Sequence, residues 1–225
     1  EDVSNKIDQF GSNLLILPKG GETLSFGGVT IGTGSGQELD MSMIPTMYTI
    51  ENNETLAIIS PKLLAEGEIL GKKVLLVGVE FPEELRLKKW WQIQGLAKGQ
   101  VPEAKEIIVG SDVARIFDLK PGDKVEIKGQ EFQVRGVIET TGSMENDQAI
   151  FMDLGTLQSL ENKPTGLSLI EAAVLCYTCP IEDVTTQLRE KLPETRVTAL
   201  QATLESRDNT VEQFRLLGIF ISLIL

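Results

Sequence analysis

The chain ends in an almost continuous apolar run, "FRLLGIFISLIL", from Phe214 to Leu225. A helix at the surface of a water-soluble domain carries apolar residues on one face and polar residues on the other. From Leu216 onward only Gly218 and Ser222 are not strongly apolar, so a helix here would be hydrophobic all round. Such a helix is buried or enters lipid, and since a bilayer needs about 20 such residues, we expect the start of a transmembrane helix. Its entry residues would be Phe214, Leu216, Leu217, Ile219, Phe220 and Ile221.

The composition predicts a folded protein that does not bind nucleic acid. Of the 225 residues, 41% are hydrophobic and 24% are charged, which is adequate for a core. Asp and Glu number 33 against 21 Lys and Arg, and no stretch clusters basic residues as a phosphate backbone would require. The same acidity argues against adhesion to an anionic membrane surface.

Several classes of site are excluded by residues that the sequence lacks. Histidine is absent, which excludes Ser-His-Asp and Cys-His nucleophile systems and His-based zinc sites. No Gly-Lys-Ser/Thr loop of the Walker type is present. We therefore expect no catalytic residue, no cofactor and no metal site. The polar start, "EDVSNKIDQF", lacks the regions of a signal peptide, so a signal was removed or a membrane segment lies upstream.

The first third of the chain alternates apolar runs with glycine-rich loops. Strands are predicted at Asn13–Pro18, Leu56–Pro61 and Lys72–Glu80. Residues 20–36 hold seven glycines and indicate a mobile loop or a loose hairpin; the "GTGSG" within them lacks the spacing of a dinucleotide-binding turn. Residues 37–55 are ambiguous, with room for a short helix that Pro45 ends.

The middle of the chain is richer in strands. We expect a strand at 106–109, a helix Ser111–Phe117, and two strands at 124–128 and 131–138 joined by a turn at Gly129-Gln130. Apolar and polar residues alternate on both sides of this turn, as in a sheet with one buried face. A strand at 148–153 and a helix at 153–160 follow.

The last third returns to alternating strand and helix. A strand at 168–177 precedes a helix that Pro180 opens, and a strand at 195–200 comes next. The sequence therefore predicts an α+β fold in which a β-rich insert separates two pieces of an α/β portion.

The two cysteines, Cys176 and Cys179, form a single C-x-x-C pair. A closed zinc site needs four ligands, which makes metal binding here unfavourable. Cys179 lies close to the start of the helix that Pro180 opens, where a thiol can become reactive. A structural disulfide or two unreactive thiols are the favoured interpretation, and redox chemistry is the alternative.

Trp90 and Trp91 stand in tandem. Adjacent residues on a strand face opposite sides, so we expect at least one indole in the core, while the other is a candidate partner contact. Carboxylates are plentiful, but no two are shown to converge; the segments 83–85 and 205–208 are typical of solvated helix surface.

Three stretches together resemble the extracytoplasmic (periplasmic) core domain of MacB-like, FtsX/LolE-type ABC transporter permeases. They are "NKIDQFGSNLLILPKG", the region from "WWQIQG" through "EIIVGSDVARIFDLKPGDKVEIKGQEFQVRGVIETTGS" to "DQAIFMDLGTLQSL", and "VTTQLREKLPETRVTAL". The second is the most specific, with a Gly-Ser before a short helix, a Gly-Asp turn, a hairpin and a Thr-Gly. The resemblance implies a discontinuous porter-like α/β subdomain (1–80 and 165–204), an inserted β-rich subdomain (81–164), and a stalk with the start of a membrane helix (205–225).

The resemblance also implies a function. The domain would sit outside the cytoplasmic membrane and convert ATP-driven movement into export, lipoprotein release or mechanical signalling. Its partners would be a cytoplasmic ABC ATPase subunit, a second permease protomer, and a periplasmic adaptor or lipoprotein. Two alternatives remain open: a sensor domain of a membrane receptor, and a membrane-tethered thiol oxidoreductase resting only on Cys176 and Cys179.

Overall fold

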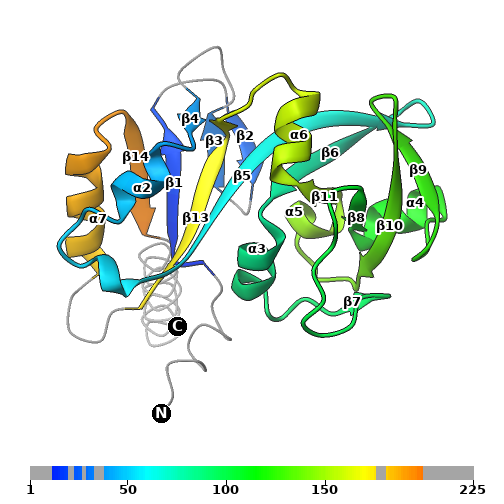
Figure 1. Cartoon of the computed structure of the whole chain (residues 1–225), viewed down its shortest axis with the longest axis horizontal. Helices are drawn as coiled ribbons and strands as arrows, with labels where there is room; N and C mark the ends of the chain where they lie inside the picture. Colours follow the sequence, from blue (N-terminus) through cyan, green and yellow to red (C-terminus); the bar gives the residue numbers. More distant parts are fainter. Residues whose placement is uncertain (1–11, 20–22, 27–28, 33–37, 176–180, 200–225) are drawn as a thin grey trace, which may run out of the picture.

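The computed structural model describes residues 12–19, 23–26, 29–32, 38–175 and 181–199. These residues form an α+β fold in which short helices pack on one large sheet, and Figure 1 shows two lobes side by side. The predicted fold class is confirmed. The two cysteines and the apolar C-terminal run lie outside the described residues.

A single mixed sheet runs through both lobes. Within the described residues its strands are β1 (Leu14–Pro18), β5 (Leu56–Ile69), β6 (Lys72–Val79), β7 (Ile93–Gln94), β8 (Glu106–Val109), β9 (Lys124–Ile127), β10 (Gln130–Ile138), β11 (Ala149–Asp153), β13 (Leu169–Val174) and β14 (Thr195–Ala199). Their order is β14-β1-β13-β5-β6-β11-β8-β10-β7, with β9 paired to β10. The β6–β11 and β8–β10 pairs are parallel and the other pairs are antiparallel.

Strand β5 is where the two parts of the sheet meet. Its residues from Leu56 to Lys62 pair with β13, and those from Lys62 to Ile69 pair with β6. Lys62 is thus the one β5 residue that is matched on both sides in the described sheet. Pro61 precedes it, where β5 has only β13 as a neighbour, and a proline is tolerated at such an edge because it lacks an N–H.

Two small sheets accompany the large one. Strand β2 (Thr23–Phe26) pairs with β3 (Val29–Gly32), so the glycine-rich region holds a hairpin, one of the two alternatives predicted for it. Strand β4 (Leu39–Asp40) pairs with β12 (Gly166–Leu167).

Helices cover both faces of the large sheet. They are α2 (Met43–Met47), α3 (Phe81–Leu87), α4 (Ser111–Phe117), α5 (Met144–Asp147), α6 (Leu154–Leu160), α7 (Ile181–Lys191) and a 3-10 turn (Asn53–Thr55). Neighbouring β6 residues Leu76 and Val77 belong to different buried clusters, because successive strand residues face opposite sides. Leu157 of α6 joins the first cluster, and Phe81 of α3 joins the second. Helix α3 therefore lies on the opposite face from α6.

Most of the predicted elements are found, with three corrections. Helix α2 begins at Met43 and contains Pro45 in its first turn, where the missing N–H has no helical partner in any case. The hairpin between β9 and β10 turns at Lys128-Gly129, one residue earlier than predicted; both residues have positive φ, as in a type I′ turn. Strand β5 continues to Ile69, well past the predicted end at Pro61.

The glycine of the Gly-Ser pair before α4 is required by close packing. A Cβ on Gly110 would lie 2.2 Å from the carbonyl oxygen of Asn146 and 2.6 Å from that of Asp147. Because both contacts are with the backbone of α5, they cannot be relieved by a side-chain rotation. The lack of a side chain at Gly110 therefore allows the start of α4 to pack closely against α5. This packing explains the glycine of the Gly-Ser motif that was singled out in the sequence.

Candidate functional site

The tandem tryptophans lie in the turn that follows α3, not on a strand. Trp91 is 8% exposed and packs edge-on against Phe151, with ring centroids 4.7 Å apart. Trp90 is 41% exposed. The expectation of one core indole is confirmed. The reason given for it, that adjacent residues on a strand face opposite sides, was wrong. The backbone N–H of Trp91 donates to the carbonyl of Lys88 in a turn, not to a strand partner.

A groove of about 970 Å³ surrounds Trp90. We call it the Trp90 groove. It is lined by Pro82, Leu85, Arg86, Lys88, Lys89, Trp90, Trp91, Ile93, Leu96, Ala97, Lys98, Gly99, Gln100 and Val101. It runs from α3 through the following loop to β7. The sequence interpretation of a tryptophan as a partner contact therefore corresponds to a concave surface.

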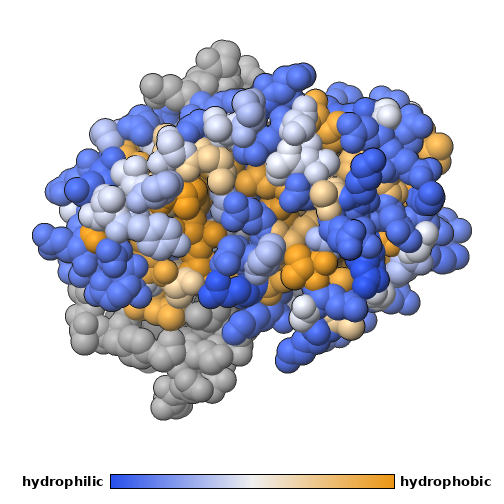
Figure 2. Space-filling view, in the orientation of Figure 1, coloured by the Kyte–Doolittle hydropathy of each residue, from blue (hydrophilic) through white to orange (hydrophobic). Residues whose placement is uncertain are grey.

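A second groove, of about 680 Å³, lies between the β5–β6 hairpin, α4 and α5. It is lined in part by Ile116 and Met144, which are exposed. Its charged lining is mixed, with Glu66 paired to Lys73 and Asp112 paired to Arg115 nearby. On the face drawn in Figure 2, hydrophobic residues gather in the middle of the molecule and hydrophilic residues form most of the outer surface.

A cluster of charged side chains is buried where the two parts of the sheet meet. Lys62 of β5 contacts Glu84 of α3, and its Nζ lies 3.2 Å from Glu171 Oε2 of β13. Lys88, just after α3, lies 3.5 Å from the same Glu171 oxygen. Lys62 and Glu84 have no exposed surface, and the other two are nearly buried. We call these four residues the buried ion cluster.

The cluster balances two positive against two negative charges. Burial by itself would raise the pKa of the Glu171 carboxyl, but Lys62 and Lys88 lower it to about 2. Burial lowers the pKa of Lys88, and the carboxylates of Glu171, Glu84 and Glu145 more than offset this and raise it. Glu171 and Lys88 are therefore both charged near neutral pH.

Ser60 joins the cluster from the same strand. Its Oγ donates to Glu84 Oε2 at 2.7 Å and accepts from Lys62 Nζ at 3.4 Å. A serine beside a lysine is a known nucleophile arrangement. Here both side chains have no exposed surface, so a substrate cannot reach them. The arrangement joins α3, β5 and β13 rather than presenting a reactive group.

Glu84 corrects the interpretation of segment 83–85 as solvated surface. The residue is fully buried, whereas Glu83 beside it pairs with Arg86 at the surface. Glu84 shares a helical face with Phe81 and Leu87, at spacings of three residues, and both of these are buried. This spacing could have marked Glu84 as an inward-facing residue. Sequence reasoning did not identify Lys62 or Glu171 either, although both stand within apolar runs.

Neither a metal site nor a membrane span is found within the described ranges. No three His, Cys, Asp or Glu residues there are grouped so that they could hold a metal ion. None of the helices there has the length and hydropathy needed to cross a bilayer.

Comparison with known proteins places this geometry in context. The model of the MacB-like periplasmic core domain matches residues 1–207. No curated protein matches the sequence. The fold is similar to that of the periplasmic region of MacB from Actinobacillus actinomycetemcomitans, with a TM-score of 0.62 and 13% identity over 93% of this chain and 99% of that one. It is also similar to the extracellular domain of the noncanonic ABC-type transporter YknZ from Gram-positive bacteria, with a TM-score of 0.53 and 10% identity over 72% of this chain and 89% of that one.

Proposed function

The chain belongs to the family of MacB-like periplasmic core domains, and from this we propose that it works as the mechanical part of an ABC transporter permease. In this proposal a cytoplasmic ATPase subunit drives movement of the membrane helices. The domain, outside the cytoplasmic membrane, passes that movement to a partner. The outcome is export, lipoprotein release or mechanical signalling, in a dimer with a second permease protomer and in contact with a periplasmic adaptor or lipoprotein.

The observation that carries the mechanical role is the joint at Lys62. Movement can pass from one lobe to the other only if the two lobes do not bend freely against each other. The described sheet is continuous through both lobes, but only Lys62 of β5 is paired on both sides. The buried ion cluster adds α3 to this point through Glu84. A stiff joint is what a force-transmitting domain needs.

The domain division follows from the same proposal. We assign residues 1–80 and 165–204 to a porter-like subdomain and 81–164 to an inserted β-rich subdomain. By sequence β6 falls in the first of these, but in space it lies beyond the joint at Lys62, where it pairs with β11 of the insert (Figure 1). Residues 205–225 would form the stalk and the start of a membrane helix, and Cys176 and Cys179 would be structural.

The test is the coding sequence on either side of this segment. We expect one hydrophobic span before Glu1 and about three after Phe214, each of roughly 20 residues. A neighbouring gene or domain for an ABC ATPase is expected as well. A single span followed by a cytoplasmic signalling domain would contradict the permease proposal and assign the domain to a membrane sensor instead.

A further inference from the structure

The Trp90 groove combines an apolar floor with a cationic rim. Apolar side chains contributed by α3, the following loop and β7 include Leu85, Trp90, Ile93, Leu96 and Val101. All four charged residues that line the groove within the described part of the chain are basic: Arg86, Lys88, Lys89 and Lys98. In a chain with a net charge of -12, a concave surface whose charged residues, in the described part of the chain, are all basic is a marked local reversal.

The basic residues are not equivalent. Lys88 is nearly buried and is committed to Glu171 in the buried ion cluster. Its Nζ also lies 5.9 Å from the centre of the Trp90 ring, so it supports that ring from the protein side. Arg86 is paired with Glu83 at the surface, an exposed pair that can exchange for another anion at little cost. Arg86, Lys89 and Lys98 have exposed side chains, so we assign contacts with a ligand to these three.

The groove lies at the end of the sheet where the described chain begins and ends. Arg86 donates to the carbonyl of Ala57, near the start of β5. At this same end, Val174 exchanges hydrogen bonds with the side chain of Asn13. Strand β1 starts at Leu14, directly after Asn13. Leu14 pairs there with Ala199, the last residue of β14. Figure 1 shows α3 and β7 in the lower half of the molecule, consistent with this placement.

We propose that the Trp90 groove binds the headgroups of anionic phospholipids in the membrane that carries the domain. This inference rests on the proposed function, because both ends of the core domain would then lead to the membrane on this side. Tryptophan has an apolar ring and a polar N–H and is enriched at the headgroup level of membranes. Arg86, Lys89 and Lys98 supply the charge that anionic headgroups attract.

The lipid proposal also explains why the net charge of the whole chain does not predict how it interacts with an anionic membrane. The acidity of the whole chain predicts repulsion from an anionic surface. Attraction at a membrane depends on charges within about a Debye length, roughly 8–10 Å, of the surface. The basic residues gathered in one groove therefore decide the interaction.

The experiment uses Trp90 as its own probe, because Trp90 and Trp91 are the only two tryptophans in the chain. In a Trp91→Phe variant of the full chain, Trp90 is the single source of tryptophan fluorescence. The variant is mixed with phosphatidylcholine vesicles, with or without phosphatidylglycerol, whose acyl chains are brominated. We expect emission to shift to the blue and to be quenched only with phosphatidylglycerol, and added salt to reverse both effects. Attachment through another part of the chain does not mimic this result, because the readout is the surroundings of Trp90.

Matched charge reversals supply the control. Lys89→Glu with Lys98→Glu should weaken the phosphatidylglycerol-dependent signal by about tenfold or more. Lys120→Glu with Lys124→Glu makes the same change in net charge at exposed positions of the same lobe that do not line the groove, and should leave the signal unchanged. A Trp90→Phe variant, in which only buried Trp91 emits, should not respond. Because this variant keeps Trp91, the difference between the unchanged chain and Trp90→Phe gives the Trp90 signal without relying on the Trp91→Phe chain.

Two results would overturn the proposal. One is an equal Trp90 signal with and without phosphatidylglycerol. The other is a response to a poly-glutamate peptide in the absence of any response to vesicles, which would assign the groove to an acidic protein segment. Neither result would affect the permease proposal, which is tested by the flanking coding sequence.

Discussion

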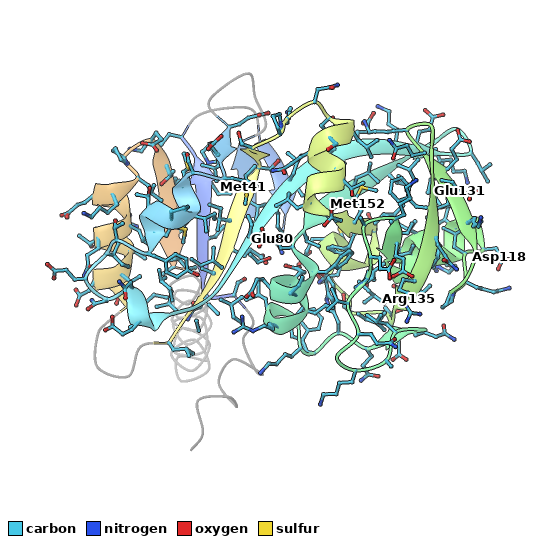
Figure 3. All side chains as sticks on the ribbon, in the orientation of Figure 1. Met41, Glu80, Asp118, Glu131, Arg135 and Met152 are labelled. Carbon is cyan, nitrogen blue, oxygen red and sulfur yellow. The ribbon has the colours of Figure 1, made fainter. Side chains whose placement is uncertain are left out.

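At the scale of single residues, Glu80 is a carboxyl group whose ionised form is unfavourable in the folded protein. It follows β6 and occupies the N-cap position of α3 without a side-chain capping bond, close to Glu83 and to Asp153 at the end of the parallel strand β11. Figure 3 labels it beside β5 in the middle of the molecule, whereas Asp118 and Glu131 lie at the outer edge. Burial, with the charges of Glu83 and Asp153, raises the pKa of Glu80 above its ordinary value of 4.5.

Replacing Glu80 with Gln should therefore stabilise the protein at neutral pH. A raised pKa in the folded state means that ionisation is less favourable there than in the unfolded chain, so ionised Glu80 costs stability above its folded pKa. The gain from Glu80→Gln should shrink as pH falls through that pKa and vanish below 4.5, where the group is protonated in both states. Urea unfolding at about pH 7 and about pH 4 measures this. Glu103→Gln at an exposed position is the control and should have little effect at either pH.

At the scale of elements, the tip of the β5–β6 hairpin carries an unfavourable residue. Leu70 and Gly71 form the two-residue turn, and both have positive φ, 48° and 77°. Such turns favour Asn-Gly, since a left-handed conformation costs a leucine roughly 1–2 kcal/mol. Leu70 is also 87% exposed, so its side chain loses little packing when it is replaced. We expect Leu70→Asn to raise the free energy of unfolding by about 1 kcal/mol in a urea titration.

The Lys128-Gly129 turn provides a matched comparison. It has the same backbone geometry, with φ values of 50° and 77°, but Lys128 lies 2.7 Å from Glu161 in an ion pair. Lys128→Asn removes the strain and the pair together, so its gain should be smaller than that of Leu70→Asn. Loss of stability in Leu70→Asn would show that the turn geometry is not what limits this hairpin.

At the scale of the whole molecule, the buried ion cluster should hold the two lobes together. Lys62→Met leaves one lysine, Lys88, for the two buried carboxylates and removes the direct partner of Glu84, and breaking a buried ion pair in this way typically costs about 3–5 kcal/mol. Lys73→Met, which removes the exposed pair with Glu66, should cost less than about 1 kcal/mol. Equal losses in the two variants would mean that the cluster does not stabilise the joint.

Movement of the lobes can be measured directly. Spin labels at exposed positions 120 and 191, in opposite lobes, require Cys176→Ser and Cys179→Ser so that only the introduced cysteines react. The distance distribution should be narrow in the otherwise unchanged chain and broader with Lys62→Met. A broad distribution in both would indicate that the lobes move freely and that force does not pass through this joint.

Local sequence pattern was sufficient to predict most elements, and the resemblance of three stretches was sufficient to predict the family. Ser111–Phe117 was predicted with the bounds that α4 has, because a short amphipathic stretch between a glycine and a turn leaves few alternatives. Pairing decided the elements that were wrong. The length of β5 depends on a second partner, β6, that takes over at Lys62, and an apolar run interrupted by Pro61 gives no sign of it.

The candidate site residues also divide into those that the sequence predicts and those that only tertiary contacts decide. The sequence by itself determined the α+β class, from the periodicity of its elements, and the family, from the resemblance of three stretches; strand alternation also led to one buried tryptophan, although the pair does not lie on a strand. Only the tertiary structure decided that Trp91 is the buried one, that Glu84 points inward, and that Lys62, Glu84 and Glu171 meet. The physical reason is that burial of a charge depends on a partner from another element, and α3, β5 and β13 are brought together by the sheet and not by neighbouring positions in the chain.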